Sequence, residues 1–273
     1  MHALAGFAAF ELGFLRPAED ALWQAVRGEL AARGFQHLPA KLTRPIDERR
    51  LWTHPALLLG QIDAYRFAQV FPHCLAAVAA PHYDAPGCTG PYYRAFVVVR
   101  EEDQATAWTA LEQRIAAVEG LDRLGSWRLF KAWVAASADP AAFFGRVMIS
   151  GGPVESLVLV RSKAADYALV DCVSWAMVRE HQPAVAKGLR VVAETDPGLA
   201  PPFVASPMRD CDERRQIYAA LAAAIADPEN AAVVAKLRLK TVQPAETLAY
   251  DAEPRPVEST ITLLSAARTQ RET

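Results

Sequence analysis

Three acidic residues stand close behind predicted strands, where they could hold a cationic group. Glu11, Asp63 and Asp171 each follow a short apolar run. Because ligands of open α/β sheets bind beyond the carboxyl ends of the strands, these carboxylates could meet at one site. Together they would attract an amine or a guanidinium and repel a bare anion. Asp63 and Asp171 are equally well placed to cap the helices that follow them, and capping does not preclude ligand contact.

Two turns of small residues could hold the opposite charge. Gly125-Ser126 and Ser150-Gly151-Gly152 each lead into a predicted helix. The N–H groups and the dipole at a helix N-terminus favour anions. Turns of this composition are more often turns without a ligand, so each signal is weak when taken singly.

Other polar and aromatic side chains near the same strand ends could line the pocket. Each aromatic residue, taken alone, is more typical of a core. The remaining ligand-binding candidates are Phe10, Gln61, Tyr83, Tyr93, Arg94, Trp127 and Trp175.

The sequence contains no motif of a common catalyst or metal site. We find no G-x-S-x-G, no Walker loop, no H-E-x-x-H and no G-x-G-x-x-G, and the six histidines have no ligand spacing. We therefore expect no catalytic residue, no metal and no cofactor. The four cysteines (Cys74, Cys88, Cys172 and Cys211) lack C-x-x-C spacing. A Cys74–Cys88 pair is the one disulfide worth considering, but free buried thiols are the favoured interpretation.

Composition excludes several classes of protein. The 273 residues are 52% hydrophobic and 22% charged, which is typical of one large or two ordinary globular domains. A formal net charge of −2 without a basic stripe predicts no nucleic-acid partner. The apolar runs are too short to span a bilayer, so we expect no membrane insertion. The N-terminus lacks the basic region of a signal peptide, which favours the cytoplasm for the chain as written and leaves a previously removed signal as the alternative.

Strand and helix patterns alternate along the chain, as in an α/β fold whose mostly parallel sheets are flanked by helices. The Pro-rich segments 81–91 and 195–207 interrupt the alternation and could connect two lobes. Strands are predicted at 3–9, 56–59, 75–80, 95–99, 114–118, 146–149, 167–170 and 189–194. Helices are predicted at 18–33, 126–136, 154–162, 173–180, 211–226 and 229–237.

Three stretches resemble the phosphate/phosphite/phosphonate-type substrate-binding proteins of ABC transporters. They run from Phe10 to Trp23, from Leu57 to Arg100, and from Asp166 to Trp175. The more specific parts are the Gly-Cys-x-Gly-x-x-Tyr pattern at 87–93 and the Asp-Cys-Val-Ser-Trp pattern at 171–175. The resemblance covers roughly residues 5–205.

The resemblance implies a two-lobed, type II periplasmic-binding-protein-like fold with two crossing strands at the hinge. Lobe one would comprise residues 1–85 and 190–273, and lobe two the inserted residues 90–185, with the hinge near 86–92 and 185–200. The lobes would close around a small-molecule ligand held in the cleft between them. An ABC permease would be the partner and the periplasm the location.

Several positions depart from the family pattern. The departures fall at Glu11, 61–63, Ala95, 123–126 and 150–153, where hydroxyl groups are lost and acids are kept or gained. Each lost charge-assisted hydrogen bond would weaken phosphonate binding by about 1.5–3 kcal/mol. We therefore expect an amine-bearing or zwitterionic ligand rather than plain phosphate, although an inward-pointing Arg123 would reverse part of this argument.

Solute binding for an ABC uptake system is thus the favoured function, with two alternatives open. One is an enzyme of small-molecule or cofactor metabolism on the same fold, with Glu11, Asp63 or Asp171 as acid–base or with Cys88 or Cys172 as nucleophile. The other is a ligand-sensing module in the cytoplasm.

Overall fold

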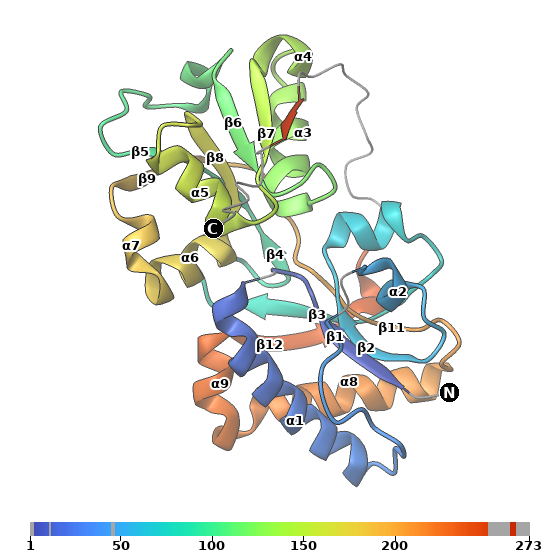
Figure 1. Ribbon diagram of the computed structural model, residues 1–273. Coiled ribbons are helices and arrows are strands. Elements are labelled where there is room, and N and C mark those ends of the chain that lie inside the picture. The colour runs from blue at the N-terminus through green and yellow to red at the C-terminus, as the bar shows by residue number, and fades with distance from the viewer. Residues whose placement is uncertain (1–2, 11, 45–46, 251–262, 266–273) are drawn as a thin grey trace, which may run out of the picture. The chain divides into compact units, whose positions relative to one another are not determined.

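The computed structural model describes residues 3–10, 12–44 and 47–250 and, by its backbone, the strand at 263–265. Contacts divide the chain into two compact units, whose elements are drawn in Figure 1. Unit 1 comprises Met1–Tyr93 and Pro197–Glu253, and unit 2 comprises Arg94–Asp196 and Pro254–Thr273. The chain therefore enters unit 2 after Tyr93 and returns to unit 1 after Asp196.

Unit 1 is built on a five-stranded mixed sheet of order β1-β2-β11-β3-β12. Strands β1 (Leu4–Phe7) and β2 (Leu57–Gln61) are parallel, with Phe7 opposite Gln61. Strand β11 (Phe203–Ala205) runs antiparallel to both β2 and β3 (Ala76–Tyr83), and β12 (Leu239–Pro244) runs antiparallel to β3. Strands β1, β2 and β3 thus point the same way, and their carboxyl ends lie at one edge of the sheet.

Two long helices stabilise unit 1. Helix α1 (Arg16–Ala32) buries Leu22, Val26 and Leu30, which recur every four residues on one face. It packs against α8 (Cys211–Ala226) and α9 (Ala231–Lys236), as Figure 1 shows. The shorter helical segments are η1 (Gly13–Leu15), α2 (Arg49–Trp52), the π-helical turn η2 (Arg66–Val70), η5 (Pro228–Asn230) and η6 (Ala245–Thr247).

Unit 2 is built on a six-stranded mixed sheet of order β13-β7-β6-β8-β5-β9. Its four parallel strands are β6 (Ile115–Val118), β7 (Arg146–Ile149), β8 (Tyr167–Asp171) and β13 (Leu263–Ser265). Strand β5 (Ala95–Arg100) runs antiparallel to both β8 and β9 (Leu189–Glu194).

An aromatic core holds one set of helices against this sheet. Trp127, Phe130, Phe143 and Phe144 pack with Tyr167 of β8 in a single buried cluster. They belong to the π-helical turn η4 (Leu124–Arg128), to α3 (Leu129–Ala135), to α4 (Pro140–Phe143) and to the residue after it. The other helical segments of unit 2 are η3 (Trp108–Leu111), α5 (Pro153–Arg161), α6 (Cys172–His181) and α7 (Pro183–Ala186).

The two segments that cross from one unit to the other run side by side. In unit 1, β4 (Tyr92–Tyr93) pairs antiparallel with β10 (Gly198–Leu199). In unit 2, Arg94 donates through Nη1 to the carbonyl oxygen of Thr195, and the N–H of Ala95 donates to Thr195 Oγ1 at 3.0 Å. Thr195 is only 1% exposed, so it ties the two segments together inside the protein.

Every strand and helix that the sequence predicts has a counterpart here, with boundaries shifted by a few residues. Three differences stand out. The sheets are mixed rather than mostly parallel, because β11 and β12 add antiparallel pairs to unit 1 and β5 adds antiparallel pairs to unit 2. Residues 190–194, which the sequence analysis assigns to lobe one, pair with β5 of unit 2, and β13 pairs with β7 there. The lobe boundaries stay a prediction.

Candidate functional site

In unit 2, three parallel strands end together at one edge of the sheet. Val118 of β6 lies opposite Ile149 of β7 and Leu169 of β8. Glu119 and Ser150 directly follow β6 and β7, and Asp171 is the last residue of β8, so the register brings all three to the same edge. Two of the three predicted acid or anion positions in this unit, Ser150 and Asp171, therefore share that edge.

Ser126 carries the clearest binding signal of unit 2. It lies in η4, in the helical run that continues into α3, and it is 3% exposed. Its hydroxyl oxygen is buried and has no hydrogen-bond partner among the residues that the structure describes. An unsatisfied buried hydroxyl costs about 1–3 kcal/mol, a cost that a ligand oxygen would remove. The neighbours Gly125 and Trp127 are also buried, and Trp127 packs on Phe144 in the core with ring centroids 4.8 Å apart.

A buried ion pair lies next to Ser126. Arg123 Nε is 3.0 Å from Glu119 Oε1, and the two side chains are 11% and 8% exposed. Arg123 thus meets a carboxylate inside the protein, which offsets its positive charge. Glu119 is not among the residues predicted for the site; its position directly behind a predicted strand and four residues before Arg123 is the sequence feature that indicates the pair.

The turn at Ser150 largely satisfies its own polar groups. Ser150 Oγ lies 2.7 Å from Ser156 Oγ and 3.1 Å from the carbonyl oxygen of Val118. The N–H of Gly151 donates to the carbonyl oxygen of Glu119 at 3.1 Å, and that of Gly152 to Ser150 Oγ at 3.3 Å. Gly151 has φ of 89°, which favours glycine. The turn is therefore a rigid link between the ends of β6 and β7.

The two described acids cap helical segments, as the sequence allows. Asp63 is 4% exposed, and its Oδ1 accepts from the N–H groups of Tyr65 and Arg66 at 2.8 and 3.2 Å. Asp171 is 6% exposed, and its Oδ1 accepts from the N–H of Ser174 at 2.8 Å. Glu11, the third acid, lies outside the described residues.

In unit 1, three predicted residues from three strand ends come together. Gln61 ends β2, Tyr83 ends β3, and Phe10 follows β1. Gln61 Nε2 donates to the Tyr83 hydroxyl oxygen at 2.7 Å and to the carbonyl oxygen of Pro201 at 3.2 Å. The ring of Phe10 meets the ring of Tyr83 edge-on, with centroids 5.4 Å apart. The convergence of these residues is the geometry that an open α/β sheet predicts.

These contacts fix which way the Gln61 amide points. A carbonyl oxygen can only accept, so the Gln61 atom facing Pro201 must be the nitrogen. Both amide hydrogens are then used, one on Pro201 and one on Tyr83. The remaining polar atom of Gln61 is Oε1, an acceptor suited to an N–H or O–H group.

The other candidates serve the crossing segments or a surface groove. Tyr93 is 1% exposed in β4, and Arg94 bonds to Thr195. Trp175 lines a groove with residues of α7 and β9.

A polar pocket of about 270 Å³, which the sequence does not predict, adjoins the end of β1. Arg44 bridges Glu19 at 3.0 Å and Asp20 at 2.8 Å. Burial raises the pKa of the Glu19 carboxyl, against the lowering effect of Arg44. About 25 residues separate these partners, so local spacing could not pair them. The lining residues are Phe7, Ala8, Leu12, Arg16, Glu19, Thr43, Arg44 and Glu48.

Other site classes find little support in the described part of the chain. There, no group of three or more His, Cys, Asp or Glu side chains is placed to hold a metal ion. All four cysteines are free, but only Cys172 is buried, and Cys211 is exposed, which corrects the expectation of buried thiols. No single described helix could cross a membrane; α8 with residues 228–236 passes that test only as a pair bent by 67°.

Comparison with known proteins decides the family. A family model of periplasmic substrate-binding proteins of ABC phosphonate transporters matches residues 63–250. The chain belongs to this family. Its members bind substrates for transport rather than transform them, which disfavours the enzyme alternative. No curated protein sequence matches the chain.

Solved structures show the two-lobed fold of this ABC substrate-binding protein. A Prochlorococcus marinus phosphonate-binding protein in complex with methylphosphonate aligns with a TM-score of 0.70, 13% identity and coverage of 91% of this chain and 94% of that one. A binding component of a Pseudomonas aeruginosa ABC phosphonate transporter aligns with a TM-score of 0.68 and 15% identity, and the alignment covers 89% of this chain and 80% of that one. A Xanthomonas citri protein bound to ATP aligns with a TM-score of 0.67 and 12% identity, and the alignment covers 90% of this chain and 92% of that one.

Proposed function

We propose that this protein binds a small phosphonate-like solute that also carries an N–H group, as the substrate-binding component of an ABC uptake system. The observation that carries the proposal is the buried hydroxyl of Ser126, which has no partner among the described residues and lies in η4, the helical turn that follows β6 in unit 2. It is a donor without an acceptor, as an anion site requires.

Unit 1 offers an acceptor of its own at the ends of its strands. Gln61 presents Oε1 as an acceptor, and its orientation is fixed by Pro201 and Tyr83. An ammonium or amide N–H satisfies such an acceptor, whereas a fully ionised phosphate does not. A zwitterion carries both kinds of group, an anionic oxygen suited to a donor such as the Ser126 hydroxyl and an N–H suited to an acceptor such as Gln61 Oε1.

Isothermal titration against three ligands tests this assignment. We expect the affinity to fall in the order 2-aminoethylphosphonate, methylphosphonate, inorganic phosphate. Gln61→Met keeps the size of the side chain but removes the acceptor, so it should erase the preference for the amine while leaving methylphosphonate affinity within about threefold. Equal affinity of the wild type for phosphate and the aminophosphonate would contradict the ligand class, and no binding of any of the three would contradict the function.

The family further supports a periplasmic location and a membrane permease with its ATPase as partner. Reconstitution of the transporter in vesicles tests this step. The loaded protein should stimulate ATP hydrolysis more than the unloaded protein, and equal stimulation would argue against a transport role.

A further inference from the structure

A basic groove runs along the free edge of the unit 2 sheet, and the ligand-binding proposal makes no use of it. The groove has a volume of about 490 Å³, within the range of binding concavities. It is lined by residues of α6, α7, β9 and the turns beside them. They are Trp175, Arg179, Pro183, Ala186, Lys187, Leu189, Arg190 and Val191.

The groove lies against the edge of β9 rather than against one face of it. Leu189, Arg190 and Val191 follow one another in β9, so their side chains point alternately to opposite faces. Consecutive residues, whose side chains point to both faces of a strand, line one groove where that groove follows the strand's edge. Strand β9 is the last in the sheet order and pairs with β5 on one side. In the described part of the chain, its outer side faces no other strand and could pair with one.

Three cations surround this edge, and none of the eight lining residues is acidic. Arg190 donates through Nη2 to the carbonyl oxygens of Asp103 and Ala105, at 2.6 and 2.7 Å. These acceptors are backbone carbonyls, so they fix the position of the guanidinium without forming an ion pair. Among the described residues, Arg179 and Lys187 form no ion pair.

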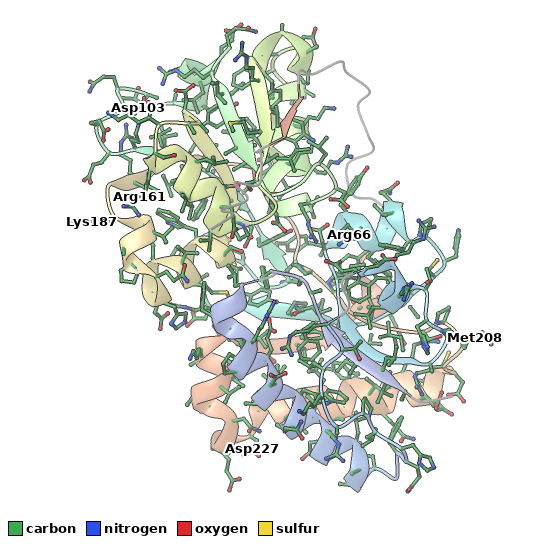
Figure 2. All side chains as sticks on the ribbon, in the orientation of Figure 1. Arg66, Asp103, Arg161, Lys187, Met208 and Asp227 are labelled. Atoms are coloured by element: carbon green, nitrogen blue, oxygen red, sulfur yellow. The ribbon has the colours of Figure 1, made fainter. Side chains whose placement is uncertain are left out.

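A fourth cation stands nearby. Arg161 of α5 donates through Nη1 to the carbonyl oxygen of Ala184 in α7 at 2.5 Å. Figure 2 shows Arg161 and Lys187 on the same side of unit 2, next to α7. The chain as a whole has a net charge of −2, so this concentration of positive charge is local.

Protection of an exposed edge against aggregation explains only part of this arrangement. A charged side chain on the strand itself is enough for protection, and Arg190 supplies it. Arg179 and Lys187 come from other elements and converge on the same groove. Leu189, Val191 and Trp175 add apolar residues to the lining of the groove, which suits an extended chain with side chains on alternate faces.

We propose that this groove binds an extended acidic segment of a partner protein. The segment adds a strand to the outer edge of β9 and sets its carboxylates against Arg179, Lys187 and Arg190. Backbone pairing gives the affinity, and the charges select the partner. This surface is separate from the residues proposed to hold the solute.

Peptide titration of the full chain tests the proposal. The probe is a capped octapeptide of alternating glutamate and threonine, and the matched peptide has lysine for glutamate. We expect binding of the acidic peptide only, with slower amide hydrogen exchange at 189–194 and loss of affinity at high salt. The charge-reversed variant Arg179→Glu/Lys187→Glu should weaken binding by about tenfold or more.

Control measurements keep the outcomes apart. Lys240→Glu changes an exposed cation on β12, the edge strand of the unit 1 sheet, and should leave peptide affinity unchanged. Unchanged affinity in the charge-reversed variant, or binding without slower exchange in β9, would overturn the proposal. Displacement of the peptide by tripolyphosphate would indicate a site for small anions instead. Dimerisation through the groove in the absence of peptide would indicate that a second copy of the chain occupies it. Methylphosphonate affinity of the charge-reversed variant reports separately on solute binding.

Discussion

At the scale of residues, two buried hydroxyl groups allow the effect of a substitution on ligand binding to be distinguished from its effect on stability. Ser126 and Tyr167 each bury an oxygen that has no partner in the described part of unit 2. Ser126 lies in η4 and is proposed to contact the ligand, whereas Tyr167 lies in the aromatic core. Burial raises the pKa of the Tyr167 hydroxyl, with a smaller contribution from Asp166, so the group stays neutral and serves no acid–base role at neutral pH.

Paired substitutions exploit this difference. Ser126→Ala and Tyr167→Phe should each raise the free energy of unfolding of the ligand-free protein by about 1 kcal/mol, because each removes an unsatisfied polar atom. Only Ser126→Ala should weaken phosphonate binding, by about tenfold or more. Urea denaturation and calorimetric titration measure the two effects. Equal affinities of the two variants for methylphosphonate would remove Ser126 from the site.

The environment of Asp103 should make the free energy of unfolding depend on pH in the acidic range. Burial alone would raise the pKa of this carboxyl, but the N–H of Ala105 and the guanidinium of Arg114, 3.0 Å away, together lower it below 3.8. A lowered pKa in the folded state adds stability above the ordinary pKa, and that stability is lost as the pH falls further.

Asp103→Asn should therefore cost about 1 kcal/mol in the free energy of unfolding at pH 7. The difference from wild type should shrink below pH 3.8, where the ordinary carboxyl protonates. Asp212→Asn changes an exposed acid that also pairs with an arginine, and it should have little effect at any pH. A constant difference across the pH range would refute the assignment.

At the scale of elements, the crossing segments depend on one side chain. Thr195 Oγ1 accepts from the N–H of Ala95 at 3.0 Å and donates to the carbonyl oxygen of Asp196 at 2.8 Å. Thr195→Val keeps the shape of the side chain but leaves the buried N–H of Ala95 without its hydrogen-bond acceptor. We expect a loss of about 1–3 kcal/mol in the free energy of unfolding, whereas Thr241→Val, at an exposed position of β12, should change little. Equal small losses in both variants would show that the hydroxyl has no structural role.

Elements long enough to show a period were predictable from sequence. Helix α1 repeats its apolar residues every four positions, and β2 is one buried apolar run. The four-residue helices α2, α4 and α7 are a single turn each, too short for any period. Strands β4 and β10 have two residues and exist only because they pair with each other.

The site was predictable where strand ends alone determine position. Gln61, Tyr83 and Phe10 converge because parallel strands end at one edge. The pair of Glu119 with Arg123 and the link of Arg44 to Glu19 depend on turns and on distant segments, which local patterns do not reveal. For Asp63 and Asp171 the sequence is compatible with either a helix cap or a ligand contact and does not distinguish them. The structure shows that both residues cap helical segments.

At the scale of the whole molecule, a ligand that binds only the folded chain must stabilise it. At a ligand concentration about 100 times the dissociation constant, the gain should be about 2.7 kcal/mol. Thermal unfolding with and without 2-aminoethylphosphonate measures this gain, and lysine at the same concentration controls for a non-specific amine effect. No stabilisation at a saturating concentration would contradict the proposed ligand.

The pairing of β13 with β7 has a practical consequence for handling the protein. In the part of the chain that the structure describes, the three residues Leu263–Ser265 cover that border of the six-stranded sheet. A proteolytic cut after Tyr250 would detach this cover and leave bare strand backbone at both borders, at β7 as well as at β9. Clipped preparations would then be expected to self-associate on storage, even though the remaining 250 residues contain every element proposed to recognise the solute.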